Sequence, residues 1–257
     1  MENKIVFFDI DGTLLNTEKK IPQTTKASIE ELKKNGVHVV IATGRPPFMF
    51  EQIREELEID SYVSFNGQHV VYKGETIYKK PMKKHEIIHL HEDTLQSKIP
   101  MVYFSESEMR ATVGEHQYIK EGLGKLKFYY PEKDEHFPFN ESIYQALMFC
   151  EKGKEDSLIQ KHASFYFLRW HTYSIDILPV GGTKAIGIEH MMKASGLNHA
   201  DSYAFGDGLN DLEMLQAVGT GVAMGNARDS LKTIADFVTD SSDNDGIFKG
   251  LKQLKLI

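Results

Sequence analysis

Short apolar strands alternate with amphipathic helices at both ends of this chain, and this alternation limits the folds that it can adopt. In the first 80 residues, apolar segments rich in β-branched and aromatic residues at 4–10, 37–42 and 62–65 are separated by predicted helices. The same rhythm returns after residue 180. Strands that alternate with helices form parallel sheets covered by helices on both faces. We therefore predict a doubly wound, Rossmann-like α/β core.

The other elements of this core are predicted from apolar periodicity and from the glycines that end helices. Before residue 80 they are helices at 24–35 and 46–57 and a hairpin of strands at 69–72 and 76–78. After residue 180 they are helices at 183–195, 210–217, 228–235 and 245–254, with strands at 202–205, 221–224 and 237–239. We expect the two ends of the chain to form one sheet.

The middle of the chain has a different pattern. One helical stretch at 83–98 is followed by strand candidates with few helices between them. These candidates lie at 100–104, 110–113, 126–130, 143–149, 165–170 and 174–178. Many strands with few crossover helices are typical of a separate α+β unit. We predict a core built from residues 1–80 and 180–257, with an α+β unit inserted at 81–179.

Composition narrows the class of protein. The chain has 257 residues, 41% of them hydrophobic, which is enough for a sizeable core. A net charge of −7 argues against nucleic acid or an anionic membrane as the main partner. The single cysteine, Cys150, excludes an internal disulfide and suits a reducing compartment. The apolar run near the start is too short for a signal peptide or a membrane span, so we expect a cytoplasmic protein.

The first predicted strand ends in a pair of acidic residues, in the stretch DIDGT that begins at Asp9. Side chains alternate along a strand, so Asp9 and Asp11 point the same way and their charges repel each other. A hard cation between them would relieve the repulsion, and Mg²⁺ prefers a few carboxylates together with water and phosphate oxygens. We therefore predict that Asp9 and Asp11 face a Mg²⁺ ion.

Three further polar clusters lie at strand ends or helix starts. They are Ala42–Arg45, Gly181–Lys184 and Gly206–Asp211. Open parallel sheets bind ligands beyond the carboxyl ends of their strands, so we expect these clusters to gather near the acidic pair. Backbone N–H groups at Thr43–Gly44 favour an anion, and Lys184 can neutralise its charge. Together the clusters predict a site for a divalent cation and a phosphate.

Such a set of side chains suits phosphoryl transfer. Aspartate can attack phosphorus and form an aspartyl-phosphate, which is the role that we predict for Asp9. Asp11, two residues further on, would protonate the leaving oxygen and later deprotonate the attacking water. The remaining contribution of the protein is positioning and charge neutralisation, which the metal and Lys184 would supply.

In this order, the four clusters resemble the four motifs of the haloacid dehalogenase superfamily of phosphatases. The stretch DIDGTLL from Asp9 is similar to the family's DxDGTLL motif, and ATGR at Ala42–Arg45 is similar to its second motif. Lys184 stands where the third-motif lysine is expected, and GDGLND at Gly206–Asp211 is similar to the GDGxND form of the fourth. The insertion between the second and third motifs resembles the Cof-like branch, which carries a large α+β cap.

This resemblance implies a role for each motif residue. In the family the first aspartate is the nucleophile and a metal ligand, here Asp9, and the second is the general acid/base that also faces the metal, here Asp11. Asp207 is implied as a further metal ligand, with Asp211 as a ligand or directly behind the ligands. The implied phosphate contacts are the backbone of Ile10 and the residues Thr43, Gly44, Lys184 and Asn210. The cap would close over the site and select the substrate.

The expected function is therefore a Mg²⁺-dependent phosphatase that hydrolyses small phosphorylated metabolites through an aspartyl-phosphate. One alternative is a phosphomutase on the same scaffold, which passes the phosphoryl group to another hydroxyl. Another is a non-catalytic regulator that binds a phosphorylated metabolite. An EF-hand is disfavoured, because the third acidic position and the terminal glutamate of that loop are missing.

The inserted unit offers weaker signals. Arg169 and Asp176 lie on predicted strands and are candidate substrate contacts, although strand packing explains them about as well. His85, His89 and His91 have a spacing that could hold zinc. No nearby cysteine or acidic residues complete a tetrahedral site, so we interpret this segment as a solvated helix.

Overall fold

The structure is a computed structural model that describes residues 3–125 and 129–257. The chain divides into two compact units. The first unit comprises the segments up to Arg45, Met49–Lys79 and Thr183–Ile257, and the second comprises Lys80–Gly182 together with Pro46–Phe48. Apart from this short segment, these boundaries lie within three residues of those that the sequence predicts. Within the described residues, no helix has the length and apolar character that crossing a bilayer requires.

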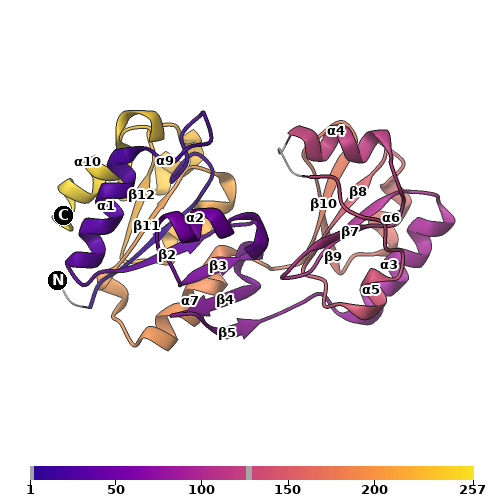
Figure 1. The fold of residues 1–257 in the computed structure, drawn as a ribbon, viewed down its shortest axis with the longest axis horizontal. Coiled ribbons are helices and arrows are strands. Elements are labelled where there is room, and N and C mark those ends of the chain that lie inside the picture. Colours follow the sequence, from indigo (N-terminus) through magenta and orange to yellow (C-terminus); the bar gives the residue numbers. More distant parts are fainter. Residues whose placement is uncertain (1–2, 126–128) are drawn as a thin grey trace. The chain divides into compact units, whose positions relative to one another are not determined.

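The first unit is built on one eight-stranded sheet (Figure 1). Its strands are β1 (Ile5–Phe8), β2 (His38–Ala42), β3 (Tyr62–Ser64), β4 (His69–Tyr72), β5 (Glu75–Lys79), β11 (Ser202–Gly206), β12 (Thr220–Ala223) and β13 (Phe237–Val238). Their order across the sheet is β13-β12-β11-β1-β2-β3-β4-β5. All neighbours from β13 to β3 are parallel, and β4 and β5 form the predicted antiparallel hairpin. The doubly wound α/β core is confirmed.

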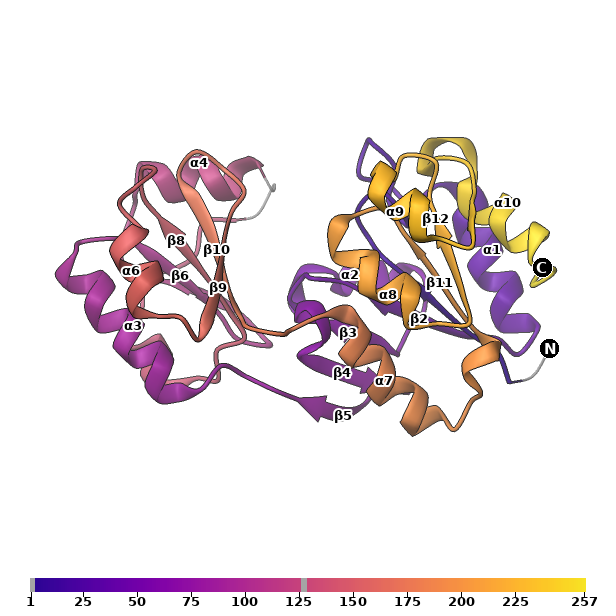
Figure 2. The ribbon, with the colours of Figure 1, turned by 180° about the vertical axis from the view of Figure 1, so that it is seen from behind.

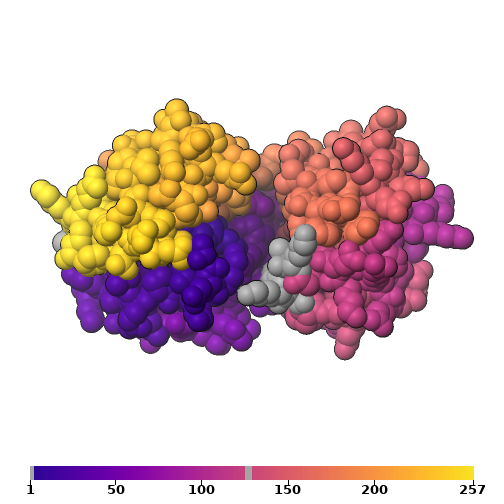
Figure 3. Space-filling model, turned by 90° about the horizontal axis from the view of Figure 1, so that it is seen from above, coloured from indigo at the N-terminus to yellow at the C-terminus, as the bar shows by residue number. Residues whose placement is uncertain are grey.

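Helices cover both faces of this sheet. They are α1 (Gln23–Lys34), α2 (Glu51–Glu56) and α10 (Gly246–Gln253) on one face, and α7 (Lys184–Ser195), α8 (Leu212–Gln216) and α9 (Asp229–Ile234) on the other (Figures 1 and 2). Alternate residues of β1 belong to the two cores: Val6 and Phe8 pack beneath α1 and α10, and Ile5 and Phe7 beneath α7 and α8. The C-terminal and N-terminal segments pack against each other, as the yellow and indigo surfaces of Figure 3 show.

Two predicted helices are shorter than expected. The predicted helix 46–57 consists of a 3₁₀ turn, Pro47–Met49, and the six-residue α2. Phe50 separates them because its backbone is not helical (φ −132°, ψ 19°), while its side chain is buried in the core. The predicted helix 210–217 likewise begins with a 3₁₀ turn at Leu209–Asp211 before α8. Further 3₁₀ turns lie at Phe65–Gly67, His199–Asp201 and Ser242–Asn244.

The second unit contains a five-stranded antiparallel sheet in the order β7-β6-β8-β10-β9. Its strands are β6 (Met101–Phe104), β7 (Met109–Ala111), β8 (Gln145–Phe149), β9 (Phe165–Arg169) and β10 (Ser174–Pro179). Its helices are α3 (Lys84–Gln96), α4 (Gln117–Lys125), α5 (Phe137–Asn140) and α6 (Asp156–Lys161). A separate core of residues such as Leu90, Tyr103 and Ile175 lies between the sheet and the helices.

The sequence predicted only one of these four helices. In α4 two glycines interrupt the apolar pattern, yet Gly122 is required there, because a Cβ at this position would lie 2.3 Å from Ser174 Oγ. The helices α5 and α6 have only four and six residues, too few for a periodicity to be recognised. Of the strand predicted at 126–130, residues 126–128 lie outside the described residues, and Tyr129 and Tyr130 are not in a strand.

The fold of the first unit brings the predicted clusters to one edge. Phe8 is level with Ile41 on β2 and with Phe205 on β11, so these three strands end together. Asp9, Thr43 and Asp207 each follow the end of one of them. Since the strands are parallel, the residues after their carboxyl ends emerge on the same side of the sheet.

Candidate active site

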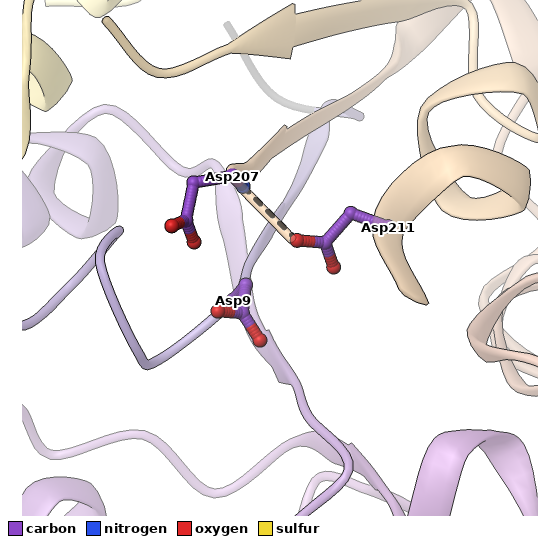
Figure 4. A group of neighbouring side chains, drawn as sticks. All are labelled: Asp9, Asp207 and Asp211. Atoms are coloured by element: carbon purple, nitrogen blue, oxygen red, sulfur yellow. Dashed lines mark hydrogen bonds between the residues drawn. The ribbon is translucent and has the colours of Figure 1, made fainter. Parts of the chain in front are cut away.

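Two carboxylates, those of Asp9 and Asp211, share one buried lysine at this edge. Lys184, the first residue of α7, is fully buried, and its Nζ donates to Asp9 Oδ1 at 2.5 Å and to Asp211 Oδ1 at 2.6 Å. Asp211 Oδ2 accepts from the backbone N–H groups of Asp207 (3.0 Å) and Gly208 (2.9 Å), as Figure 4 shows for Asp207. Asp211 is thus fully engaged by the protein, whereas Asp9 keeps Oδ2 free of hydrogen bonds from the described residues.

These carboxylates form a candidate metal site. Among the described residues, Asp9, Asp207 and Asp211 are the group whose ligand atoms all lie within 4.8 Å of one another (Figure 4). The Asp207 carboxylate accepts hydrogen bonds from the Thr13 hydroxyl (3.4 Å) and the Asn226 amide (3.2 Å), both of which are neutral. A set of hard oxygen donors with excess negative charge fits Mg²⁺.

The pKa values of the site carboxylates reflect burial and the charges around them. Burial is the main cause that raises the pKa of Asp9 to about 7; Lys184 opposes this shift, and the charges of Asp211 and Asp11 add to it. Burial and the charge of Asp211 raise the pKa of Asp207 to about 6. Burial alone would lower the pKa of Lys184, but the two carboxylates beside it raise it. A bound divalent cation would favour the ionised form of Asp9 and Asp207.

Glycines let the backbone approach these carboxylates closely. Gly12 has φ +81°, and a Cβ there would lie 2.3 Å from Asp207 Oδ2. At Gly206 a Cβ would lie 2.7 Å from Asp211. Gly12, which follows Asp11, and Gly206, which precedes Asp207, therefore leave room for the carboxylates of Asp207 and Asp211.

Asp11 is held by two cations. Arg45 binds it with two nitrogens, Nε to Oδ2 at 2.8 Å and Nη2 to Oδ1 at 2.7 Å, and Lys19 Nζ donates to Oδ1 at 2.8 Å. Burial would raise the pKa of Asp11, but the hydrogen bonds and charges of Arg45 and Lys19 outweigh it and lower that pKa. The structure thus holds Asp11 as a carboxylate, directed at Arg45.

The predicted phosphate contacts lie around the same strand ends. The backbone N–H groups of Ile10 and Gly44 donate to no acceptor among the described residues. The N–H of Thr43 donates to Val63 O (2.8 Å), and its hydroxyl accepts from the N–H of Arg45 (3.1 Å). Asn210 lies beyond β11, where its Nδ2 donates to Asn66 Oδ1 at 3.2 Å.

Sequence reasoning missed several residues that touch the predicted ones. Lys19 and Arg45 bind Asp11, and Asn226 bonds both Asp207 and the carbonyl of Gly12. Asn66 was detectable, because its Asn-Gly pair follows a predicted strand at the same edge of the sheet. Lys19 and Asn226 had no such signal, since their loops reach the site only in the folded chain.

The two candidates in the second unit point to opposite faces of its sheet. Arg169 is level with Ile175, whereas the next residue of β10, Asp176, is level with Leu168. The Arg169 guanidinium binds Glu155 (2.7 Å) and backbone carbonyls, including that of Thr172 (2.7 Å), contacts that stabilise this unit.

Asp176 accepts a hydrogen bond from Gln145 Nε2 at 3.1 Å, and burial raises its pKa to about 6 despite this hydrogen bond. On the same face of the sheet, Tyr166 and Leu168 are exposed, whereas Leu147 on β8 is buried.

The histidines of α3 do not form a metal site within the described residues. His91 is buried and bonds the Tyr103 hydroxyl through Nδ1 at 3.1 Å, so α3 is not a solvated helix along this face. His85, by contrast, is largely exposed.

Comparison with known proteins agrees with the motifs. Residues 6–251 match the family model for haloacid dehalogenase-like hydrolases. YkrA of Bacillus subtilis (strain 168), which is named a "putative phosphatase", is 46% identical over the full length of both chains. YitU of the same organism, named a 5-amino-6-(5-phospho-D-ribitylamino)uracil phosphatase, is 30% identical over 98% of both chains.

Solved structures share the fold of the whole chain. A hypothetical protein from Geobacillus kaustophilus HTA426 is 50% identical, with a TM-score of 0.98 over 99% of this chain and 100% of that one. The phosphatase BT1666 from Bacteroides thetaiotaomicron is 26% identical, with a TM-score of 0.87 over 100% of this chain and 96% of that one. This chain belongs to the haloacid dehalogenase-like hydrolases and is a phosphatase of that family.

Proposed function

We propose that this protein hydrolyses small phosphate monoesters in a Mg²⁺-dependent reaction through an aspartyl-phosphate on Asp9. The observation that carries the proposal is the arrangement of Asp9, Lys184 and Asp207. One oxygen of Asp9 accepts a hydrogen bond from a buried lysine, and the other accepts none from the described residues. The carboxylate of Asp207, which forms no ion pair within the described residues, lies close enough to Asp9 for both to bind one metal ion. Asp9 and Asp207 would hold the Mg²⁺ ion, with Asp211, whose oxygens already accept hydrogen bonds from Lys184 and two backbone N–H groups, directly behind them. Asp11 would face the ion after turning from Arg45. Bound there, the ion would neutralise charge on the phosphoryl oxygens.

In the first half of the reaction, Asp9 Oδ2 would attack phosphorus while the bond to the leaving oxygen breaks. Lys184 fixes the orientation of Asp9 through Oδ1. The N–H groups of Ile10 and Gly44, with Asn210, would bind the phosphoryl oxygens. Asp11 would first take up a proton and turn away from Arg45. It would then give this proton to the leaving oxygen.

In the second half, water would attack phosphorus and the bond to Asp9 would break. Asp11 would take the proton of that water. The ion pair with Arg45 and Lys19 keeps Asp11 in the ionised form that this step requires. Inorganic phosphate and the restored Asp9 carboxylate are the result.

The second unit is proposed as the cap that selects the substrate. Relatives of 28–30% identity are named phosphatases of a phosphoribitylamino-uracil, and one solved structure of 28% identity is a sugar phosphatase. Polyhydroxylated phosphate esters are therefore the first compounds to test. Asp176 is the proposed contact to a substrate hydroxyl, because its carboxylate can accept hydrogen bonds, as it does from Gln145, on the face of the sheet where Tyr166 and Leu168 are exposed. Arg169 is a weaker candidate, since its guanidinium is already occupied.

The test is phosphate release from a panel of compounds: p-nitrophenyl phosphate, sugar phosphates, 5-amino-6-(5-phospho-D-ribitylamino)uracil, pyridoxal phosphate and nucleotides. Wild type, Asp9→Asn and Asp176→Asn are compared with Mg²⁺ and with EDTA. We expect release that requires Mg²⁺ and falls by at least about 10³-fold in Asp9→Asn, because the nucleophile is lost. Asp176→Asn should keep activity on p-nitrophenyl phosphate and change the ranking of the metabolites.

Product analysis separates hydrolysis from the alternatives. An isomeric phosphate ester in place of free phosphate would identify a mutase. Equal release by wild type and Asp9→Asn, after removal of contaminating phosphatases, would exclude Asp9 as the nucleophile.

A further inference from the structure

The turn that follows β3 has an unusual backbone. Phe65, Asn66 and Gly67 have φ values of +50°, +50° and +94° in succession. The left-handed region disfavours residues with a Cβ, and a buried aromatic residue such as Phe65 is rarely found there. Such backbones persist where the surrounding structure fixes them, often at functional sites.

This turn contacts three of the four motif clusters. Phe65 N–H donates to Arg45 O at 3.3 Å, and Asn66 N–H donates to Thr43 O at 3.1 Å. On its other side, a Cβ at Gly67 would lie 2.1 Å from Thr183 O, next to the start of α7. The turn is thus fixed between the loop after β2 and the helix that carries the buried lysine.

The Asn66 side chain connects this turn to the fourth cluster. Its Oδ1 accepts from Asn210 Nδ2 at 3.2 Å. A Cβ at Gly44 would lie 3.0 Å from both Oδ1 and Nδ2 of Asn66, so the half-buried carboxamide covers that glycine. The Oδ1 of the same Asn210 amide packs against Gly208, where an added Cβ would lie only 2.7 Å away.

We propose that Asn66 is a positioning residue for phosphate binding, which acts through Asn210; this rests on the proposed function. An amide nitrogen carries two hydrogens. One of those on Asn210 Nδ2 goes to Asn66, which fixes the rotamer and leaves the second hydrogen for a phosphoryl oxygen. Without that acceptor, the Asn210 side chain is fixed only when phosphate binds. Part of the binding free energy is then lost to this ordering, and phosphate binds more weakly.

The left-handed backbone supplies a clean variant. Glycine adopts φ +50° without cost, so Asn66→Gly removes the carboxamide while relieving the turn. Lys73→Gly is the matched control, because Lys73 also has φ +51° but lies in the turn of the β4–β5 hairpin. Binding of inorganic phosphate in the presence of Mg²⁺ is measured by calorimetry. Steady-state kinetics with p-nitrophenyl phosphate give kcat and KM. Asn210→Ala and the double variant complete the cycle.

We expect Asn66→Gly to weaken phosphate binding roughly 5- to 30-fold, as loss of one positioning hydrogen bond does, with an unchanged or higher melting temperature. In the Asn210→Ala background the same change should weaken binding less than about 2-fold. Lys73→Gly should bind phosphate like wild type. Asn66→Asp, which keeps the acceptor, should retain the kcat of wild type better than Asn66→Gly at saturating substrate.

Wild-type phosphate affinity in Asn66→Gly would overturn the inference. An equal loss in the Asn210→Ala background would also overturn it, because Asn66 would then act independently of Asn210. Phosphate binding that depends on Asn66 in a protein that releases no phosphate from any ester would support the inference while contradicting the proposed hydrolysis. A wild type that binds no phosphate would overturn both.

Discussion

Asp207 lies beside the carboxylates of Asp9 and Asp211 and forms no ion pair with a cation among the described residues. Its hydrogen bonds come from the neutral side chains of Thr13 and Asn226. The pKa of Asp207 is raised to about 6, so its ionised form is disfavoured in the metal-free protein. This arrangement of carboxylates is the one that the proposed Mg²⁺ ion would stabilise.

We predict that Asp207→Asn stabilises the metal-free protein at pH 8. A folded-state pKa above the ordinary value of 3.8 means that the folded protein binds more protons between about pH 4 and 6, so this group destabilises the fold as pH rises through that window. After allowance for solvent screening, the gain at pH 8 should be about 1–2 kcal/mol, and it should vanish near pH 4.

Thermal unfolding in EDTA and in Mg²⁺ measures this effect. Wild type should gain stability on addition of Mg²⁺ at pH 8, and Asp207→Asn should gain much less. A variant that is less stable than wild type at both pH values in EDTA would show that Asp207 stabilises the fold instead.

At the scale of elements, the site depends on how closely α7 packs on the strand ends. Gly187 lies one turn after Lys184, and a Cβ there would lie 2.3 Å from Val63 Cγ1 and 3.0 Å from Gly67 Cα. Both neighbours are stiff, since Val63 is a β-branched residue in β3 and Gly67 is backbone. The close contact of Gly187 with Val63 and Gly67 thus helps to set the position of the buried lysine.

We predict that Gly187→Ala destabilises the protein by about 1–3 kcal/mol through overpacking and lowers kcat/KM by displacing Lys184. Gly124→Ala is the matched control: Gly124 is also a helical glycine, in α4, and outside its own helix no atom of the described residues lies within 4 Å of the added Cβ. By helix propensity the control should be neutral or stabilising by up to about 1 kcal/mol. Chemical denaturation and steady-state kinetics measure both, and a Gly187→Ala protein as stable as the control would refute the close contact.

Which elements were predictable follows from how local their signals are. β1 and its acidic pair are encoded within seven residues, and the alternation of the core is repeated along the chain, so both were recognised. The helix α4 was missed because it contains Gly122, which disfavours a helix by propensity. This glycine is required by the close approach of Ser174 in β10, a contact that the sequence pattern does not reveal. The partners of Asp11 and Asp207 were missed because Lys19 and Asn226 come from loops whose paths depend on tertiary packing.

At the scale of the whole molecule, the second unit has its own sheet and its own core. Its buried residues, among them Leu90, Tyr103 and Met148, pack on one another in a core of their own. A unit with a closed core of this kind can fold alone.

We predict that a fragment of residues 80–182 unfolds cooperatively on heating, as measured by circular dichroism, and gives a dispersed amide NMR spectrum. It lacks only Pro46–Phe48 of its unit. The matched fragment 183–257 should not fold, because β11 loses the pairing with β1. A random-coil spectrum for residues 80–182 would show that the second unit needs the first.

The order of the large sheet has a consequence for synthesis on the ribosome. β1 is a central strand, yet its neighbour β11 begins at Ser202, 194 residues after Phe8. At about 5–20 residues per second, roughly 10–40 s pass before that neighbour is made. During this interval the nascent chain presents the edge of an apolar strand, Ile5–Phe8, to other chains and to chaperones. The insertion that supplies a second unit thus also lengthens the time for which the nascent protein is open to aggregation.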